Sequence, residues 1–306
     1  MQKPLDIHLS HLMTLINNLT SEVIKRNMYK IVKKKELNSQ VKLYEILAPR
    51  VAKKAKPGQF VVLRLNDEGE RVPFTISDTD VDRGTVTLVV QEVGKTSMHM
   101  GLLNEGESIK DFVGPLGLPT HFENVKRALV IGGGLGSAIA YPQTKNFFDK
   151  GIDVDSIVGF RSHDLVILEE EMRAKSTRLF ITTDDGTYGM KGFVTEALKK
   201  LLDEGNIYDV IVAIGPPVMM RAVCEITKPY GIKTLVSLNP IMIDGTGMCG
   251  CCRVSVGGET KFACIDGPDF DGHEVDFDQL MKRNAMYRNQ EKVSLDNHVC
   301  KLTGKH

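Results

Sequence analysis

RALVIGGGLGS, residues 127–137, sets the fold class of this 306-residue chain. An apolar run occupies 128–131, and four of the next five residues are glycines. A strand that ends in glycines directly before a helix is typical of a parallel sheet, where the chain turns tightly at the strand's carboxyl end. Further strands are predicted at 154–160, 177–184, 209–215 and 233–238, and helices near 136–149, 165–175, 192–203 and 217–228. Residues 123–238 are therefore expected to form an α/β unit, a parallel sheet with helices on both faces.

Upstream of this unit, short strands follow one another closely. They are predicted at 29–37, 40–47, 59–65, 72–77, 85–93 and 107–114, with one helix at 96–103. Six such strands indicate a small antiparallel β-barrel or sandwich over residues 28–122. Residues 239–306 form a third region, rich in Gly, Cys and Asp, that ends in a polar helical tail. Residues 1–27 are either a leader with a short amphipathic helix or the product of a misplaced start codon, and we favour a start at Met28.

Composition excludes several classes of protein. Apolar residues make up 42% and charged residues 25%, as in ordinary globular chains. Lys plus Arg equals Asp plus Glu, 39 against 39, so no net positive field favours nucleic acid or an anionic membrane. The longest apolar run, residues 128–141, has 14 residues and includes four glycines, too short for a membrane span. We expect neither a nucleic-acid nor a membrane partner.

The six cysteines are clustered, at positions 224, 249, 251, 252, 264 and 300. A disulfide scaffold spreads its cysteines through a small secreted chain, whereas clustered cysteines favour a metal site in a reducing compartment. Residues 1–27 lack the pattern of a secretory signal peptide, so we expect a cytoplasmic protein. Cys224 and Cys300 lie apart from the cluster and are expected to be ordinary thiols.

Residues 243–267 read IDGTGMCGCCRVSVGGETKFACIDG. Plant-type [2Fe–2S] sites use Cys-x4-Cys-x2-Cys and a later Cys, and here Asp244, Cys249, Cys252 and Cys264 have that spacing. The residues alone leave three alternatives: a zinc site with one carboxylate ligand, a site that uses Cys251 in place of Asp244, or buried thiols without metal. The spacing favours the iron–sulfur interpretation.

Several loops have the composition of phosphate sites. The glycine run at 132–136 precedes a helix, and Asp184-Asp185-Gly186 and GPPVMM at 215–220 follow other strands of the same predicted sheet. In the barrel, RVPFTI at 71–76 offers Arg71 to a phosphate, and EVGKTS at 92–97 opens a helix at Gly94. Each barrel motif alone also fits a solvated arginine or a plain helix cap. Together the sheet loops predict a nucleotide cleft.

In this order the motifs resemble the ferredoxin–NADP reductase superfamily, in which a flavin-binding barrel precedes a pyridine-nucleotide domain. The third region narrows the resemblance to the electron-transfer subunits of dihydroorotate dehydrogenase and their relatives. LNPIMIDGTGMCGCCRVSVGG at 238–258 and ACIDGPDFDGHEVDF at 263–277 look most like one branch. That branch contains the small (alpha) subunits of NADH-dependent ferredoxin:NADP oxidoreductase, also called sulfide dehydrogenase. The resemblance covers residues 28 to about 291.

The resemblance implies three groups of site residues and no catalytic side chain for the hydride step. Thr75 would lie near flavin N5. FAD is expected to contact Arg71, Pro73, Phe74, Thr75, Val90, Gln91, Gly94, Lys95, Thr96 and Ser97. NAD(H) is expected to contact Gly132, Gly133, Gly134, Gly136, Ser137, Arg161, Asp185, Gly186, Gly215, Pro216 and Met219. In this branch an aspartate replaces the first cluster cysteine, so the implied [2Fe–2S] ligands are Asp244, Cys249, Cys252 and Cys264.

Two positions depart from the family pattern. Arg71 stands four residues before Thr75, one more than in many superfamily members, and Ile214 replaces a frequent cysteine before the Gly-Pro turn. Arg161, after the second strand of the sheet, would suit the 2′-phosphate of NADP(H). The resembling subunits nevertheless handle NAD(H), which we therefore expect.

The implied function is electron transfer between NAD(H), FAD and a [2Fe–2S] cluster. A hydride would pass between nicotinamide and flavin, and electrons would pass through the cluster to a partner. The implied partner is a larger flavoprotein subunit with further iron–sulfur clusters, through which ferredoxin and NADP(H) are reached in a bifurcating complex. The alternatives are the electron-transfer subunit of dihydroorotate dehydrogenase and, from another class, a zinc-stapled nucleotide-binding regulator.

Overall fold

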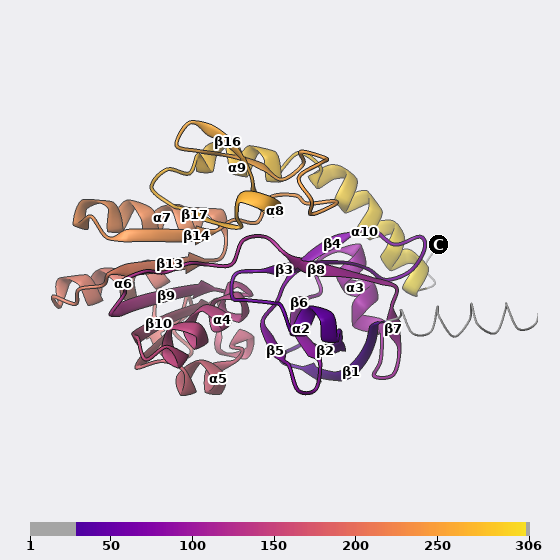
Figure 1. Cartoon of the computed structure of the whole chain (residues 1–306), viewed down its shortest axis with the longest axis horizontal. Helices are drawn as coiled ribbons and strands as arrows, with labels where there is room; N and C mark the ends of the chain where they lie inside the picture. The colour runs from indigo at the N-terminus through magenta and orange to yellow at the C-terminus, as the bar shows by residue number, and fades with distance from the viewer. Residues whose placement is uncertain (1–28, 304–306) are drawn as a thin grey trace, which may run out of the picture.

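The computed structural model describes residues 29–303, with side chains through 296. The prediction for residues 1–27 lies outside this part of the chain. Figure 1 shows the β-barrel beside the α/β unit, with the C-terminal region lying across both. Within the described residues, no helix has the length and apolar character needed to cross a membrane.

The barrel is built from two antiparallel sheets. Its strands are β1 Tyr29–Glu36, β2 Val41–Leu47, β3 Phe60–Arg64, β4 Val72–Thr75, β5 Asp78–Asp80, β6 Thr85–Gln91, β7 Ser108–Ile109 and β8 Asp111–Leu116. One sheet has the order β5-β6-β2-β1-β7 and the other β4-β3-β8. Two helices accompany them, α2 Pro49–Ala52 and α3 Lys95–Leu102. Tyr44, Leu63, Leu88 and Met100 are fully buried between the sheets.

The prediction of a single strand at 107–114 was wrong. This segment forms β7, which pairs with β1, and β8, which pairs with β3, so one stretch serves both sheets. A strand that changes sheets must bend at the corner, and Lys110 lies at that break. The short elements β5 and α2 were not predicted.

The second unit contains the predicted parallel sheet. Its strands are β9 Arg127–Gly133, β10 Asp153–Phe160, β11 Arg178–Thr183, β12 Met190–Lys191, β13 Val210–Ile214 and β14 Lys233–Ser237. The helices are α4 Gly136–Asp149, α5 Glu169–Ala174, α6 Val194–Asp203 and α7 Pro217–Thr227, with the 3-10 turns η1 His163–Leu165 and η2 Lys228–Tyr230. The helix expected at 165–175 is divided into η1 and α5, because Leu168 between them adopts a positive φ of 55°.

Alternate residues of the central strand confirm that helices cover both faces. Leu129 and Ile131 of β9 pack in the cluster that includes α6 and α7. Ala128 and Val130 face the other way and pack with Phe147 of α4. Side chains on a strand alternate between faces, so a continuous apolar run is what a doubly covered strand requires.

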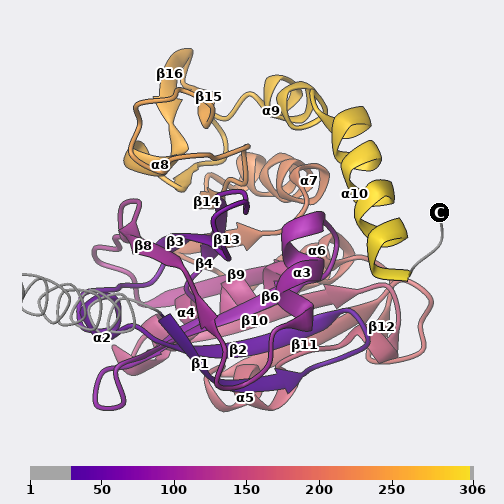
Figure 2. The same ribbon diagram turned by 90° about the vertical axis from the view of Figure 1, so that its right-hand side faces the viewer.

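The C-terminal region is joined to the sheet by a strand of its own. It contains the hairpin β15 Arg253–Val256 and β16 Glu259–Phe262, then α8 Ala263–Asp266, β17 Asp269–Asp271, α9 Phe277–Asn284 and α10 Arg288–Thr303. β17 pairs antiparallel with β14, with Val236 opposite Phe270, and ends the order β12-β11-β10-β9-β13-β14-β17. Figure 2 shows α10 descending from α9 to α3, which it contacts.

One buried polar junction links all three parts of the chain. Thr120, in the connection between barrel and sheet, donates a hydrogen bond to Oδ2 of Asp269 in β17. Gln143 of α4 donates to the Thr120 hydroxyl and, at 3.3 Å, to the same carboxylate oxygen. Oδ1 of Asp269 is buried and has no hydrogen-bond partner among the described residues. Burial raises the pKa of the Asp269 carboxyl, so the junction favours its protonated form.

Candidate functional site

The predicted nucleotide residues lie on loops at the carboxyl ends of β9, β10, β11 and β13. These strands are parallel and form one continuous part of the sheet, so their ends meet at one edge. Open α/β sheets bind ligands at this edge. The predicted group there consists of Gly132, Gly133, Gly134, Gly136, Ser137, Arg161, Asp185, Gly186, Gly215, Pro216 and Met219.

Met219 joins two of these loops. A Cβ added to Gly133 would lie 2.4 Å from the Met219 sulfur, and one added to Gly215 would lie 2.7 Å from its terminal methyl. Only glycine at both positions leaves room for this side chain. The hydroxyl of Ser137, at the start of α4, is buried and has no hydrogen-bond partner among the described residues. A helix N-terminus and a free buried hydroxyl fit a phosphate group of a nucleotide.

Arg161 and Asp185 lie on neighbouring loops. The Asp185 N–H donates to the Arg161 carbonyl at 3.2 Å. The Asp185 carboxylate accepts from the Thr187 N–H at 2.9 Å and from the Thr187 hydroxyl at 2.7 Å, and these bonds lower the pKa of Asp185. Arg161 is exposed. This side of the edge therefore presents one exposed cation and one ionised carboxylate.

The predicted FAD residues come from β4, the end of β6 and the start of α3. Pro73, Phe74 and Thr75 occupy β4, paired with β3, and Val90 and Gln91 end β6. At the start of α3 the Ser97 hydroxyl accepts hydrogen bonds from the N–H groups of Val93 and Gly94.

One contact joins these segments. The Thr96 hydroxyl lies 3.4 Å from a carboxylate oxygen of Glu70, the residue before Arg71, so the Arg71 segment and the turn formed by Gly94 to Ser97 lie together. Arg71 itself is exposed. A helix start beside an exposed arginine suits a pyrophosphate.

The predicted cluster donors occupy the loop between β14 and β15 and the start of α8. Asp244 accepts hydrogen bonds from the Thr246 N–H at 2.8 Å and the Cys249 N–H at 3.0 Å. These bonds lower the pKa of the Asp244 carboxyl, so it is ionised at neutral pH. The sulfurs of Cys252 and Cys264 are buried and lie 3.1 Å apart. The Cys252 and Cys264 sulfurs thus lie as one pair of donors, and the Asp244 carboxylate lies against the backbone of Cys249.

This donor set fits a two-iron cluster better than a single zinc ion. Among the described residues, no three His, Cys, Asp or Glu side chains are close enough together to hold one ion. A zinc site needs four donors around one point, whereas a [2Fe–2S] cluster takes two protein ligands on each iron. Burial raises the pKa of the Cys264 thiol, and the positive charge of a bound metal would favour its thiolate form.

The other thiols differ from these donors. Cys251 is half-buried next to Cys249, and burial raises the pKa of its thiol. Cys224 is buried in α7, as expected of an ordinary thiol. Cys300 lies beyond the described side chains.

The cluster loop packs directly on the barrel. Gly245 has a positive φ of 76°, and a Cβ there would lie 2.7 Å from Cδ1 of Leu116 in β8 and 3.1 Å from Cγ2 of Val62 in β3. The Leu118 N–H also donates to the Gly267 carbonyl at 2.6 Å. The predicted iron–sulfur and flavin regions are therefore in contact within one chain.

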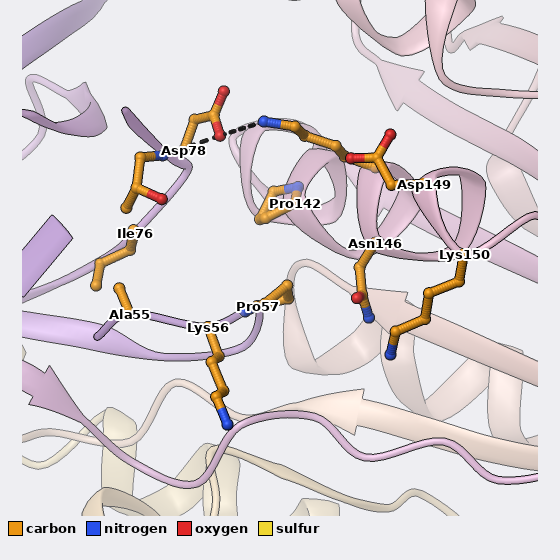
Figure 3. A pocket seen from close by; sticks show the side chains of 11 residues that line it. Ala55, Lys56, Pro57, Ile76, Asp78, Pro142, Asn146, Asp149 and Lys150 are labelled. Carbon is orange, nitrogen blue, oxygen red and sulfur yellow. Dashed lines mark hydrogen bonds and ion pairs between the residues drawn. The ribbon is translucent and has the colours of Figure 1, made fainter. Parts of the chain in front are cut away.

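A cavity of about 220 Å³ lies between the barrel and α4 (Figure 3). Its wall includes Ala55, Pro57 and Pro142, and Lys145 forms an ion pair with Asp78 across it at 2.7 Å. None of the predicted cofactor residues lines this cavity. It belongs to the interface between the two units and not to the predicted sites.

Comparison with known proteins identifies the two outer regions. Residues 28–121 match the family described as "Oxidoreductase FAD-binding domain", and residues 239–276 match "Iron-sulfur cluster binding domain of dihydroorotate dehydrogenase B". A Thermotoga maritima protein named as a homolog of the electron transfer subunit of dihydroorotate dehydrogenase B is 47% identical, over 87% of this chain and 94% of that protein. The Listeria innocua electron transfer subunit is 35% identical, over 80% of this chain and 97% of that protein. The chain belongs to this family.

A solved structure supports the same assignment. It comes from a study of flavin-based electron bifurcation in NADH-dependent reduced ferredoxin-NADP oxidoreductase. That chain is 45% identical, with a TM-score of 0.85 over 89% of this chain and 98% of its own. This member of the dihydroorotate dehydrogenase B electron-transfer family is thus an oxidoreductase subunit with an FAD-binding and an iron–sulfur domain. The predictions of fold, FAD and iron–sulfur cluster are confirmed, and a family of subunits implies a partner subunit.

Several residues around the site were missed by the sequence analysis. They include Val62 and Leu116, which contact the cluster loop, and Arg253 and Arg283, which bond to its carbonyls. Val62, Leu116 and Arg283 stand outside the quoted cluster segments and reach the loop from other elements, whereas Arg253 lies within the quoted segment but was given no role. Arg253 follows Cys252 directly, and this adjacency was the only local signal.

Proposed function

We propose that this chain is the NAD(H)-linked electron-transfer subunit of an NADH-dependent ferredoxin:NADP oxidoreductase. The observation that carries the proposal is Asp244, an ionised carboxylate at the first donor position of an otherwise cysteine-based cluster loop. The resemblance described above implies an aspartate at this position in that branch of the family. The 45% identity to a chain of this oxidoreductase supports the same choice.

The protein's part in the reaction is binding and orientation. When bound, FAD would supply hydride chemistry and the [2Fe–2S] cluster single-electron transfer. Thr75 and its neighbours in β4 would line the flavin ring, and the turn from Gly94 to Ser97 would bind its pyrophosphate through backbone N–H groups. Hydride transfer between stacked rings requires proximity and no protein acid or base.

The carboxyl edge of the sheet would bind the nicotinamide nucleotide. The Gly132–Gly134 turn and the start of α4 would hold the pyrophosphate, with Ser137 as a hydroxyl donor. Met219, fixed between Gly133 and Gly215, would form the floor of the cleft. We propose NAD(H) as the bound form, with Arg161 exposed at the rim.

Asp244, Cys249, Cys252 and Cys264 would hold the cluster, two on each iron. The hydrogen bonds from Thr246 and Cys249 keep the Asp244 carboxylate ionised and oriented. A carboxylate donates less charge to iron than a thiolate does, so Asp244 would tune the reduction potential. Cys251 would remain outside the ligand set.

We also propose that the chain works in a complex with a partner subunit. It would be a larger flavoprotein subunit with further iron–sulfur clusters, which reaches ferredoxin and NADP(H). We also propose a reducing, cytoplasmic location, because cysteines clustered at positions 249–264 favour a metal site in such a compartment over disulfides.

The test is an anaerobic titration of the flavin- and cluster-loaded chain with NADH, followed by visible absorption. We expect bleaching of both the flavin and the iron–sulfur bands, and much weaker bleaching with equal NADPH. Bleaching by NADPH alone would reverse the nucleotide assignment. If the chain as first purified, before any loading, is colourless and holds stoichiometric zinc, the zinc-stapled regulator is supported instead.

The second candidate is the electron-transfer subunit of dihydroorotate dehydrogenase. It is favoured by the match of residues 239–276 to the iron–sulfur domain of that enzyme. The purified complex separates the two candidates: reduction by dihydroorotate supports the second, and NADH-dependent exchange between ferredoxin and NADP supports the first.

A further inference from the structure

A small cavity lies directly beside the cluster loop. It measures about 110 Å³ and is lined by Pro240, Ile241, Cys251, Arg253, Arg283, Met286 and Tyr287, which we call the arginine pocket. Sites for whole metabolites typically measure about 300–1,000 Å³, so this pocket has room for the end of a side chain and not for a nucleotide. Its lining includes two guanidinium groups and no carboxylate.

The hydrogen bonds that the structure shows for these two guanidiniums all go to the cluster loop. Arg283 of α9 donates to the Cys251 carbonyl at 3.0 Å, and Arg253 of β15 donates to the Gly250 carbonyl at 3.2 Å. The Nε of Arg283 is buried and has no partner within the described part of the chain. The ion pairs of residues 217–296 involve Arg221, Lys261 and His273, and neither pocket arginine forms one.

The arginine pocket has two positively charged side chains in its lining and no negatively charged one. A guanidinium carries five N–H donors in a planar fork that matches a carboxylate, and leaving a buried donor unpaired costs free energy. Arg283 has this buried, unpaired Nε, whereas Arg253 is exposed, and no carboxylate lines the cavity between them. An anion with two acceptor oxygens would pair with both guanidiniums.

The surroundings of the pocket indicate where that anion comes from. Met286 and Tyr287, at the rim of the pocket, are 55% and 49% exposed. Met248, on the cluster loop, is 89% exposed. Arg, Met and Tyr are the residue types enriched in protein interfaces. A free small anion would leave these apolar side chains in water, whereas a docked protein would cover them.

We propose that the arginine pocket is a docking site for an acidic side chain of the partner subunit. The carboxylate of a partner Asp or Glu would enter between Arg253 and Arg283, and the apolar rim would pack around it. Since the same arginines hold the carbonyls of Gly250 and Cys251, between two predicted cluster ligands, the docked carboxylate would set the partner against the loop that carries the electrons. The inference rests on the proposed function only in requiring a partner subunit.

The test uses the complex of this chain with its copurifying flavoprotein subunit. Arg253→Glu and Arg283→Glu should each weaken assembly at least about tenfold, measured by native mass spectrometry across a salt series, because they place like charges together. Lys282→Glu is the matched control, since Lys282 is exposed on α9 beside Arg283 and does not line the pocket. It should change the dissociation constant by less than about twofold.

A second variant keeps the test valid where charge reversal disturbs the loop. Arg283→Lys retains the charge and introduces a primary amine, which a carbodiimide should couple to the partner's carboxylate as an amide. Peptide mass spectrometry should then find one cross-link from position 283 to a partner Asp or Glu. Failure to cross-link, with wild-type assembly in both charge reversals, would overturn the proposal.

Two further outcomes are informative. If assembly is unchanged while acetate raises the melting temperature of wild type but not of Arg283→Glu, the pocket binds a free carboxylate and the proposal fails. Titration of the isolated chain with NADH needs no partner. If NADH does not reduce the flavin of the wild-type chain, the proposed function fails. If NADH reduces it and the Arg253→Glu and Arg283→Glu chains assemble like wild type, only the docking site fails.

Discussion

Replacing Gly245 by alanine tests whether packing of the cluster loop on the barrel is needed for electron transfer. The left-handed backbone at φ 76° costs an alanine about 1–2 kcal/mol. The new methyl would lie 2.7 Å from Leu116 Cδ1 and 3.1 Å from Val62 Cγ2, and overpacking of this kind costs about 1–3 kcal/mol. We therefore expect a total destabilisation of about 2–5 kcal/mol, of which about 1–3 kcal/mol comes from the barrel contact.

Gly258 provides a matched control. It has a similar φ of 79° in the turn between β15 and β16, and a Cβ there would meet nothing within 4 Å. Gly258→Ala should therefore carry only the backbone cost of about 1–2 kcal/mol. The difference between the two variants isolates the contact between the loop and the barrel.

The assay combines stability with electron transfer. For a chain of this size each kcal/mol lowers the melting temperature by about 2 °C, so Gly258→Ala should melt about 2–4 °C lower and Gly245→Ala about 4–10 °C lower. In stopped-flow reduction by NADH, Gly245→Ala should bleach the flavin band at the wild-type rate and the iron–sulfur band more slowly. Equal melting temperatures and equal bleaching rates in the two variants would refute the reasoning.

Three further predictions concern the junction, the cluster and the nucleotide edge. Burial raises the pKa of Asp269, so the native state keeps a proton that the unfolded state loses above about pH 4, and stability falls as pH rises from there toward the folded pKa. Asp269→Asn should flatten this decline in calorimetric melting temperature, and an equally steep decline would contradict the assignment. Asp244→Cys should retain the cluster but shift its midpoint potential, and an unchanged potential at every pH would show that the carboxylate does not tune it. Gly133→Ala, whose methyl would lie 2.4 Å from the Met219 sulfur, should raise the KM for NADH about tenfold, and adding Met219→Ala should recover most of the loss, whereas additive effects would exclude this coupling.

Much of the fold could be predicted from patterns of residues close together in the sequence. The apolar run before Gly132 predicted β9, and alternating strands and helices predicted the parallel sheet, because burial on both faces requires a continuous apolar strand. The spacing of Asp244, Cys249, Cys252 and Cys264 indicated the iron–sulfur domain that the family match confirms. The individual roles of the site residues remain predictions.

Other features could not be read from the sequence because they depend on contacts between distant segments. β17 has three residues and becomes a strand only by pairing with β14. The division of 107–114 into β7 and β8 likewise follows from closure of the barrel, because β7 pairs with β1 and β8 with β3. Short segments carry too little periodicity to specify such pairings.

The sequence alone therefore determined the order of the three regions, the strand–turn–helix pattern of the nucleotide edge and the spacing of the cluster donors, since these depend on residues close together in the chain. Tertiary structure alone decided that Gly245 packs on Leu116, that Asp269 meets Thr120 and Gln143, and that Arg253 and Arg283 share one pocket. Spacing and periodicity encode which element forms, whereas the partner that each element meets depends on packing over the whole chain.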